Sequence, residues 1–445
     1  MIITRWFDMG RMESKYMERS VDNSLRRWML LGAAIGSVFY LCLCGVKTLN
    51  PFNYDWILNI YHDSTLSFWG WIFYEKAPFS DGLFSCYDLS YPHALSIIFT
   101  DAIAPFVIIL KPIIRVLINK HTITQYLGWW SISCYILQGL FAALLFCKTT
   151  KNKIGRTIGI IVVCLSPIMA QRLYMHNTLL AQWLVLAAMC ICVYGYELQN
   201  KRYLMWVLLF GLASMIHLYF VPMIAIVFFF EMLYEIIKEK KAIKQIVTAG
   251  ASLIVSVGVV AILGGFSTEL ADADQAWSYT ILYKYSSNLM TGILPLDYSL
   301  LLPELPMMPE EYEGFAYLGV GVLLAILIIL PIITWALIKK RIIIEDKPFF
   351  WCAVVCFIVS YLVAVGPRIT LFDNELITLK LPKMIDYISA IFRSIGRFIW
   401  IAYYMTIIAA ISFISNLDRE NAIVDGKRLK PFINILLVII LWNLL

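Results

Sequence analysis

The 445-residue sequence is dominated by apolar side chains: 61% are hydrophobic, only 15% are charged, and the formal net charge is +6. These charges are too few to cover a soluble fold, since soluble domains carry about 25% charged residues. The basic residues gather between apolar blocks, so the positive charge indicates membrane topology and not a nucleic-acid partner.

The apolar residues fall into blocks that mostly have the length needed to cross about 30 Å of hydrocarbon as a helix. We therefore predict an all-α polytopic transmembrane bundle of about 11–12 spans. The blocks are 28–46, 94–118, 126–147, 157–171, 178–197, 204–217, 219–237, 246–265, 316–338, 349–366, 398–415 and 432–445. The first block lacks a cleavage site and is predicted to be a signal anchor. The last block is short, which suggests a truncated sequence or a short span.

Basic residues predict which connections face the cytoplasm. They gather in the N-terminal segment 1–27 and in four short connections, 148–156, 238–244, 339–347 and 419–430. By contrast, segment 266–315 holds eight acidic residues and one basic residue, and segment 47–93 holds five acidic and two basic residues. We expect the transmembrane domain to span 28–445, with outward loops at 47–93, 266–315 and 367–396.

One block conflicts with this topology. If 94–118 and 126–147 were both single spans, the basic connection 148–156 would face outward. The block 94–118 contains Pro105, Pro112, Lys111 and Arg115, which are poor residues for a regular span. A re-entrant pair, a helix along the membrane surface and an ordinary span with an exceptional basic loop all remain open.

The outward segment 50–105 combines carboxylates with many aromatic side chains. A carboxylate at the membrane surface, walled by aromatic rings, suits a general base for a sugar or alcohol acceptor, because burial raises its pKa and rings stack on sugars. Asp55 is the preferred candidate, since it follows the first span by about nine residues. The same composition is also ordinary for an outward loop.

Several cations are predicted on the outward side, against the usual topological preference. They are Arg172, His176, His217, Arg393 and Arg397. Such placement favours a lipid-linked phosphate at headgroup level, which arginine binds in a bidentate manner. Ordinary interfacial side chains that extend to headgroups are the alternative.

The long outward loop ends in Glu311, Tyr312, Glu313 and Gly314. A long loop in a compact membrane domain is usually a lid or a binding loop, so Tyr312 is a candidate acceptor contact. The same residues could instead form the polar cap of the next span. The sequence contains no nucleotide-binding, zinc-protease or serine-hydrolase motif.

Several sequence runs resemble a known group of membrane proteins. They are NYDW at 53–56, HDSTLSFWGWIFYEKAPF at 62–79, SIIFTDAIAP at 96–105, NLMTGILPLDYS at 288–299, EYEGFAYLGVG at 311–321 and FRSIGRFIWIAYY at 392–404. These runs, which extend over nearly the whole chain, resemble an uncharacterised bacterial family of polytopic membrane proteins placed near the GT-C superfamily of glycosyltransferases. The superfamily transfers sugars from lipid-phosphate donors.

The resemblance implies roles for individual residues. Asp55 takes the position of the first-loop aspartate of the superfamily, the expected base. Asp63 and Asp101 become supporting or acceptor-binding residues. The acceptor site would also include Trp71, His217 and Tyr312, and the donor-phosphate site Arg172, His176, Arg393 and Arg397. Asp55 lacks the second acid of the superfamily signature, because its neighbours are Tyr54 and Trp56. The cofactor is therefore unknown, and a divalent metal stays open.

These inferences predict an integral membrane glycosyltransferase in a bacterial cytoplasmic membrane, with a cytoplasmic N-terminus. The expected partners are membrane lipids, a polyprenyl-phosphate-linked sugar and a glycan or lipid acceptor of the cell envelope. A transporter or flippase of lipid-linked saccharides is the main alternative, which predicts charges within spans and interrupted helices. A non-catalytic scaffold that keeps the fold is the third possibility.

Overall fold

The computed structural model describes residues 15–58, 63–118, 121–266, 284–338, 346–382, 392–417, 423–424, 427–428 and 430–441. Within these residues, seven helical stretches are long and apolar enough to cross a membrane, and shorter apolar helices lie at Asn177–Val193 and Val320–Trp335. The prediction of a helical chain with membrane-crossing helices is confirmed at this level. Eleven or twelve full-length spans are not seen within the described residues. Parts of the predicted segments 1–27, 266–315, 339–347, 367–396, 419–430 and 432–445 lie outside them.

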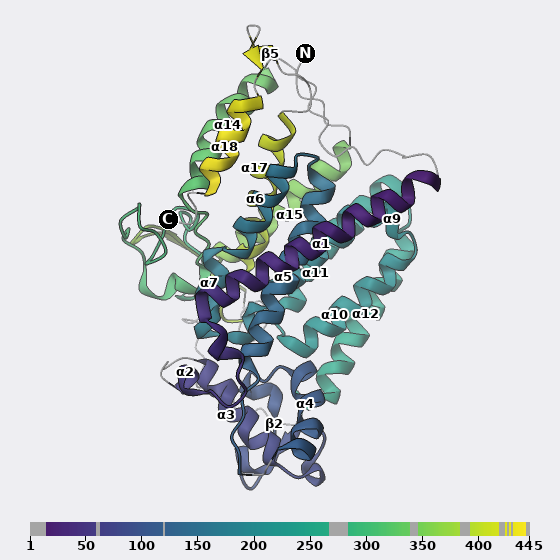
Figure 1. Ribbon diagram of the computed structural model, residues 1–445, viewed down its shortest axis with the longest axis vertical. Helices are drawn as coiled ribbons and strands as arrows, with labels where there is room; N and C mark the ends of the chain where they lie inside the picture. The colour runs from purple at the N-terminus through teal and green to yellow at the C-terminus, as the bar shows by residue number, and fades with distance from the viewer. Residues whose placement is uncertain are drawn as a thin grey trace.

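Most helices of the bundle run between two ends of an elongated molecule (Figure 1). They are α1 Lys15–Cys44, α5 Leu127–Thr149, α6 Lys153–Cys164, α7 Pro167–Met175, α8 Trp183–Val193, α10 Lys201–Ile216, α11 Phe220–Glu239, α12 Ala242–Ile262, α14 Val320–Ile338, α15 Lys347–Val365, α17 Ile399–Leu417 and α18 Lys430–Ile440. Every side chain of α8 is buried, so this helix lies at the centre of the bundle. By contrast, α1 and α12 are mostly exposed and lie at the periphery.

The first two spans of the bundle meet through glycine. A Cβ atom on Gly32 would lie 2.2 Å from the carbonyl oxygen of Gly139, and one on Gly36 would lie 2.0 Å from that of Tyr135. The two helices are antiparallel, because a step forward along α1 meets a step backward along α5. Small residues allow such close contact of backbones within membranes. We call this contact the glycine seam.

The seam settles the topology conflict at block 94–118. Because α1 and α5 are antiparallel, connection 148–156 lies at the end where α1 begins, and the Arg156 guanidinium lies 5.3 Å from the ring of Trp28. We call this the basic end and the opposite end the loop end. Block 94–118 is thus not a span: it contains strand β2 Leu95–Ser96, the 3-10 helix η4 Ile97–Thr100 and the 14-residue helix α4 Ala104–Leu117.

The polar side chains of α4 serve the packing of the loop end. Arg115 Nε donates to the carbonyl of Glu75, 3.0 Å away, in the last turn of helix α3 Asp63–Lys76. Lys111 is buried, and its Nζ lies 3.9 Å from the centre of the Tyr74 ring. These contacts explain why an apolar block contains two cations, and they leave α4 as a short helix beside α3.

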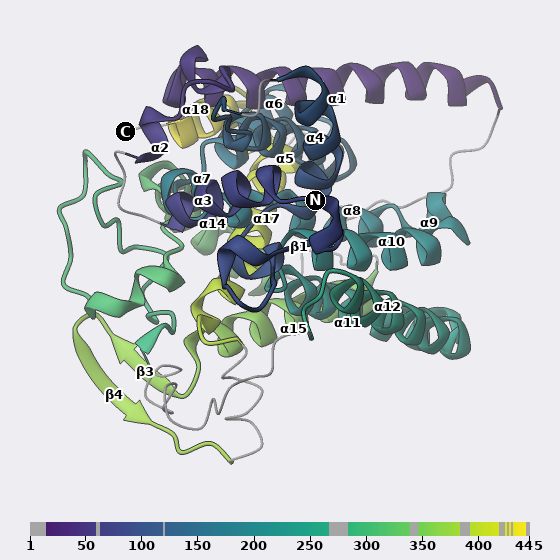
Figure 2. The ribbon, with the colours of Figure 1, turned by 90° about the horizontal axis from the view of Figure 1, so that it is seen from below.

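The loop end carries most of the remaining small elements, and Figure 1 labels α2, α3, α4 and β2 there. These small elements are the helices η1 Val46–Leu49, α2 Asp55–Leu58, η2 Phe79–Asp81, η3 Tyr87–Leu89, η6 Pro309–Gly314 and η7 Ile395–Phe398, and the antiparallel pairs of β1 Ser85–Cys86 with β2 and of β3 Arg368–Leu371 with β4 Asn374–Thr378. Figure 2 shows α1 along one edge of the molecule and β3–β4 at the opposite edge. At the basic end lie α9 Gly195–Leu198 and the pair β5 Ile423–Val424 and β6 Lys427–Arg428.

One membrane-crossing stretch is interrupted. The sequence Leu165–Ser166–Pro167 separates α6 from α7, because Pro167 begins the new helix and donates no backbone hydrogen bond. Buried polar side chains gather at this break: Gln138 donates to the Tyr404 hydroxyl at 2.7 Å, and that hydroxyl donates to Gln182 at 2.5 Å. Such partners are required where backbone groups are freed within a membrane.

A buried ion cluster joins α10 to α11 near the basic end. Arg202 donates through both terminal nitrogens to the carboxylate of Glu235, and its Nη1 lies 2.7 Å from Oε1. Glu231 accepts from the indole of Trp206 and lies 3.7 Å from Arg202. All four side chains are buried. We call this group the basic-end cluster, and it holds two carboxylates for one arginine.

Candidate functional site

Two aspartates meet where helix α3 packs against η4. Asp63, Ser67 and Gly70 lie on one face of α3, and small residues at the latter two positions allow close approach. The Ser67 hydroxyl donates to the backbone oxygen of Asp101 at 3.2 Å, and a Cβ atom on Gly70 would lie 2.2 Å from Thr100 Oγ1. Asp101 follows η4 in the left-handed conformation, with φ of 53°. These contacts fix Asp101 near Asp63.

Two histidines flank Asp101. His176 ends α7, and its Nε2 lies 2.5 Å from Asp63 Oδ2 while its Nδ1 lies 3.9 Å from Asp101 Oδ2. His217 ends α10, and its Nε2 lies 3.8 Å from Asp101 Oδ1. The backbone N–H of Tyr219 donates to His217 Nδ1 at 3.2 Å. In the neutral ring, Nε2 therefore carries the proton and faces Asp101.

Asp63 and Asp101 have different pKa values because their surroundings differ. The hydrogen bond from His176 lowers the pKa of Asp63. Burial raises the pKa of Asp101, although the charge of His176 opposes the rise. Burial also lowers the pKa of His217, which favours its neutral form. Asp101 is thus the stronger base of the pair, and 28% of its side chain stays exposed.

Two buried arginines share one carboxylate beside this group. Arg397, on η7, donates Nε and Nη2 to Glu313 at 2.8 and 2.9 Å. Arg172, on α7, contacts the same carboxylate, with its Nη2 2.8 Å from Glu313 Oε2. Burial alone would raise the pKa of Glu313, but the two arginines lower it overall. Glu313 therefore stays ionised and ties η6 to α7 and η7.

Close backbone contacts and a tyrosine hold this ion group in place. A Cβ atom on Gly396 would lie 2.7 Å from the Cα of Gly314, so η6 and η7 touch. The Tyr219 ring lies between Arg397, whose guanidinium is 4.6 Å from the ring centre, and His217, whose ring centre is 5.4 Å away. The Tyr219 hydroxyl also accepts from the backbone of Ser394 at 2.8 Å. The arginines and the histidines thus belong to one site.

We call these seven residues the loop-end cluster. They are Asp63, Asp101, Arg172, His176, His217, Glu313 and Arg397. The exposed Arg393, near Arg397 in the chain, also lowers the pKa of Asp101 by its charge. The cluster combines a carboxylate of raised basicity with nearby cations. That combination can accept a proton from a hydroxyl and stabilise a departing anion.

The structure places the other predicted site residues differently. Asp55 is exposed on α2, and no ion pair joins it to the loop-end cluster within the described residues. Trp71 is fully buried, and its indole donates to the backbone oxygen of Thr124 at 3.1 Å. Its surroundings are those of a core residue. Tyr312 is half-buried next to Glu313, and its backbone oxygen accepts from Gln171 at 3.1 Å.

The structure adds one residue that sequence reasoning did not place. Glu313 was an equal candidate for a helix cap or an acceptor contact, yet it is the shared partner of both arginines. The available signal was an acid in a predicted outward loop of a chain that has unexplained outward arginines. Within the described residues, no group of three or more His, Cys, Asp or Glu side chains is arranged to hold a metal ion. The metal requirement therefore stays open.

Comparison with known proteins identifies one family. The family described as "Domain of unknown function (DUF6311)" has a model that matches residues 33–440. No curated protein and no solved structure matches the chain. The match includes all seven residues of the loop-end cluster.

Proposed function

We propose that this chain, which belongs to the DUF6311 family, is a membrane-embedded glycosyltransferase that takes its sugar from a polyprenyl-phosphate donor. The acceptor would be a hydroxyl of a cell-envelope glycan or lipid, on the extracytoplasmic face of a bacterial cytoplasmic membrane. The observation that carries the proposal is Asp101, held between two histidines beside buried arginines at the loop end.

Asp101 is the proposed base, in preference to Asp55 and Asp63. Its raised pKa makes it a better proton acceptor than Asp63, whose carboxylate is occupied by His176. Asp63 is then a positioning residue, because it holds the His176 ring between the two acids. Asp55, to which the resemblance assigns the position of the superfamily aspartate, lies exposed on α2.

In the proposed step, the acceptor oxygen forms a bond to the anomeric carbon of the sugar. The bond between that carbon and the phosphate oxygen breaks, and the phosphate leaves with the electron pair. The acceptor proton passes to Asp101. Preorganised cations lower the energy of the developing phosphate charge without reorganising during the step.

The cations divide into two roles in this scheme. Arg172 and Arg397 already bind Glu313, so they supply a fixed positive field and hold the loop. Arg393 is exposed beside the cluster and is the proposed direct phosphate contact. His176, whose two ring nitrogens face Asp63 and Asp101, would contribute to this field without touching the phosphate. This arrangement matches an anion that approaches from the loop end.

The test uses membranes that contain the full chain and a panel of synthetic short-chain polyprenyl-phosphate hexoses. Release of polyprenyl phosphate and sugar transfer to envelope glycans are both measured. We expect Asp101→Asn to lower transfer by roughly 10²–10⁴-fold, and Asp55→Asn to retain most of it. The reverse result would return the base role to Asp55. Absence of donor turnover by the wild-type chain, together with unchanged envelope glycans in cells that lack it, would refute the function.

One observation favours a second candidate, a transporter of lipid-linked saccharides. The span at Lys153–Leu173 is interrupted at Ser166–Pro167 beside buried polar side chains. Interrupted helices occur at substrate sites of transporters. Reconstituted vesicles with a fluorescent lipid-linked sugar discriminate the two candidates, because a transporter changes the leaflet of the probe and leaves its glycosyl bond intact.

A further inference from the structure

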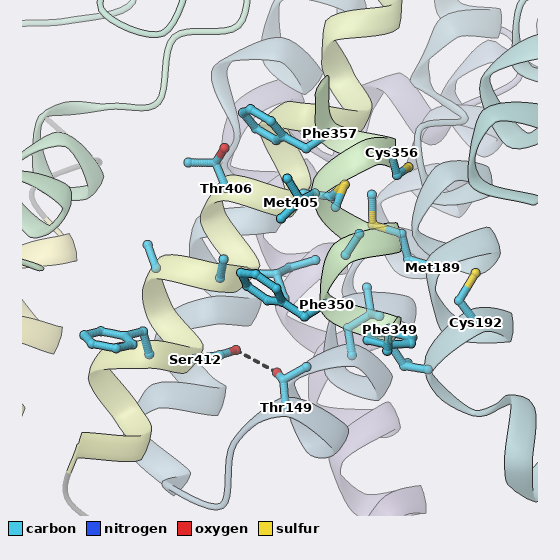
Figure 3. A pocket seen from close by; sticks show the side chains of 18 of the residues that line it. Thr149, Met189, Cys192, Phe349, Phe350, Cys356, Phe357, Met405, Thr406 and Ser412 are labelled. Carbon is cyan, nitrogen blue, oxygen red and sulfur yellow. Dashed lines mark hydrogen bonds between the residues drawn. The ribbon is translucent and has the colours of Figure 1, made fainter. Parts of the chain in front are cut away.

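An apolar groove lies among the helices of the bundle, and its lining reaches the end of the bundle called the basic end. It has a volume of about 430 Å³ and is lined by residues of α5, α8, α11, α14, α15 and α17. Figure 3 shows Phe350 and Phe357 of α15 and Met405 of α17 directed into this space. Its volume lies within the range of small-molecule sites, roughly 300–1,000 Å³.

The groove lies at the depth of the membrane hydrocarbon. All of its lining residues belong to candidate spans or to the two shorter apolar helices. On α17 the lining runs from Met405 to Asn416. The eleven helical steps between these two residues rise about 16 Å, which is about half of the ~30 Å hydrocarbon core. The groove therefore has the depth of one leaflet.

The polar side chains of the groove gather at one end, apart from Thr406, whose hydroxyl donates to the Ala402 carbonyl within α17. The lining at this end includes Thr149 at the end of α5 and Ser412 and Asn416 near the end of α17. The Thr149 and Ser412 hydroxyls lie 2.8 Å apart, as Figure 3 shows, and Asn416 donates to the Thr149 carbonyl at 2.8 Å. These residues adjoin the basic connections 148–156 and 419–430. An amphiphile with an anionic headgroup fits this polarity.

We propose that this groove binds one acyl chain of an anionic phospholipid from the leaflet at the basic end. The glycerol ester region would lie beside Thr149 and Asn416, and the chain would extend past Phe350 to Phe357. The depth of the groove selects a lipid of one leaflet, and the exposed Lys151 and Lys153 of connection 148–156 select an anionic headgroup. This lipid is distinct from the proposed sugar donor, because Ser412 and Asn416 at the polar end of the groove lie at the end of α17 opposite to Arg397.

The test is photocrosslinking of the full chain in nanodiscs that contain phosphatidylglycerol with a diazirine near the end of one acyl chain. Crosslinked peptides are mapped by mass spectrometry. With increasing probe, we expect labelling of α15 and α17 groove peptides to saturate at one lipid per chain. Labelling of the lipid-facing residues of α12 should rise without saturation. Equal, unsaturated labelling of both surfaces would overturn the proposal.

Two variants test the groove directly. Ala353→Trp and Ala409→Trp each place a large ring among the lining residues, and we expect labelling of groove peptides to fall at least about fivefold by steric exclusion. The matched control is Ile254→Trp on α12, where the side chain is 73% exposed. Thermal unfolding verifies that each variant folds. If neither variant folds, the saturation of wild-type labelling alone decides whether the groove is a lipid site. Groove peptides crosslinked mainly to a second copy of the chain would assign the groove to a protein interface instead.

Discussion

The loop-end cluster and the basic-end cluster both pair arginine with glutamate, but the first has two arginines on one glutamate and the second has one arginine with two glutamates. At the loop end, Arg172 and Arg397 share Glu313, and aspartates and histidines lie next to them. At the basic end, Arg202 lies between Glu235 and Glu231, and the aromatic side chain of Trp206 completes the group. One group is open to solvent through Asp63, whose side chain is 55% exposed, whereas the other is fully buried.

The difference separates a candidate reaction site from a structural clamp. A sealed ion cluster joins helices and leaves no room for a ligand. An accessible cluster with unequal bases can exchange protons with a substrate. Burial of charge alone therefore does not identify function in this bundle, because both ends have buried arginines. What distinguishes the two clusters is solvent access and the number of titratable groups that differ in pKa.

The largest expected effect is the loss of Arg202 from the sealed cluster. Arg202→Met leaves two buried carboxylates without a cation, and we expect a loss of about 3–5 kcal/mol in the free energy of unfolding. Thermal and denaturant unfolding in detergent micelles measure the loss. The triple variant with Glu231→Gln and Glu235→Gln should recover most of it. A loss below about 1 kcal/mol for the single variant would contradict a sealed clamp.

A smaller loss is expected when Glu313→Gln breaks the accessible cluster. Arg397 keeps the charges of Asp63 and Asp101 nearby, and the cluster opens to water through Asp63, so we expect about 1–3 kcal/mol. Glu311→Gln is the matched control on the same 3-10 helix, because the partners of Glu311 are the neutral Asn288 and Thr370. The same unfolding assay applies. A loss equal to that of Arg202→Met would show that the loop end is as sealed as the basic end.

The pH dependence of stability sharpens the comparison further. The pKa of His217 is lowered in the folded chain by burial. As pH falls below about 6.5, the unfolded chain binds a proton that folded His217 does not, so stability falls by up to about 1.4 kcal/mol per pH unit. Asp101, whose pKa is raised, acts in the opposite direction and is present in all chains compared.

Unfolding midpoints between pH 8 and pH 5.5 measure this effect. We expect the midpoint of the wild-type chain to fall more steeply with acid than that of His217→Gln. The exposed His93 supplies the control substitution His93→Gln, which should keep the wild-type slope. Identical slopes for the wild-type chain and His217→Gln would exclude His217 as the titrating group.

The smallest effect is expected for an exposed ion pair at the basic end. Lys148 pairs with Glu197, whose side chain is 47% exposed. Solvent screens such pairs, so Lys148→Ala should lower the free energy of unfolding by no more than about 1 kcal/mol. A larger loss, measured under the same conditions, would show that exposure does not separate weak from strong pairs in this protein.

Sequence reasoning predicted a helical membrane chain because length and hydropathy are local properties, but it predicted about 11–12 spans where the described residues contain seven full-length candidates. The prolines and cations of block 94–118 made a regular span only one of three open interpretations, and the structure decides among them with the short helix α4. His176, Arg172 and Arg397 were selected because their charge opposed the topology. Their proposed roles stay predictions, but the structure does bring them together at one site.

Pairings between distant segments were beyond the sequence. Glu313 and Arg397 are separated by 84 positions, and Asp63 and His176 by 113. Nothing local indicates such partners. Glu231 and Glu235 were overlooked for a related reason: both sit in an apolar block where the partner Arg202 belongs to another helix. The sequence therefore indicated candidate residues, whereas only the fold showed which ones share a site.

The glycine seam has a consequence for biosynthesis. Helix α1 ends at Cys44 and its partner α5 begins at Leu127. At translation rates of roughly 5–20 residues per second, α1 waits for several seconds before α5 follows it into the bilayer. During that interval the backbone surface at Gly32 and Gly36 faces lipid. Docking of α5 then brings together the two ends of the segment that carries Asp63 and Asp101. A larger residue at Gly139 should therefore slow assembly of the loop end, although Gly139 lies in the glycine seam and not in the loop-end cluster itself.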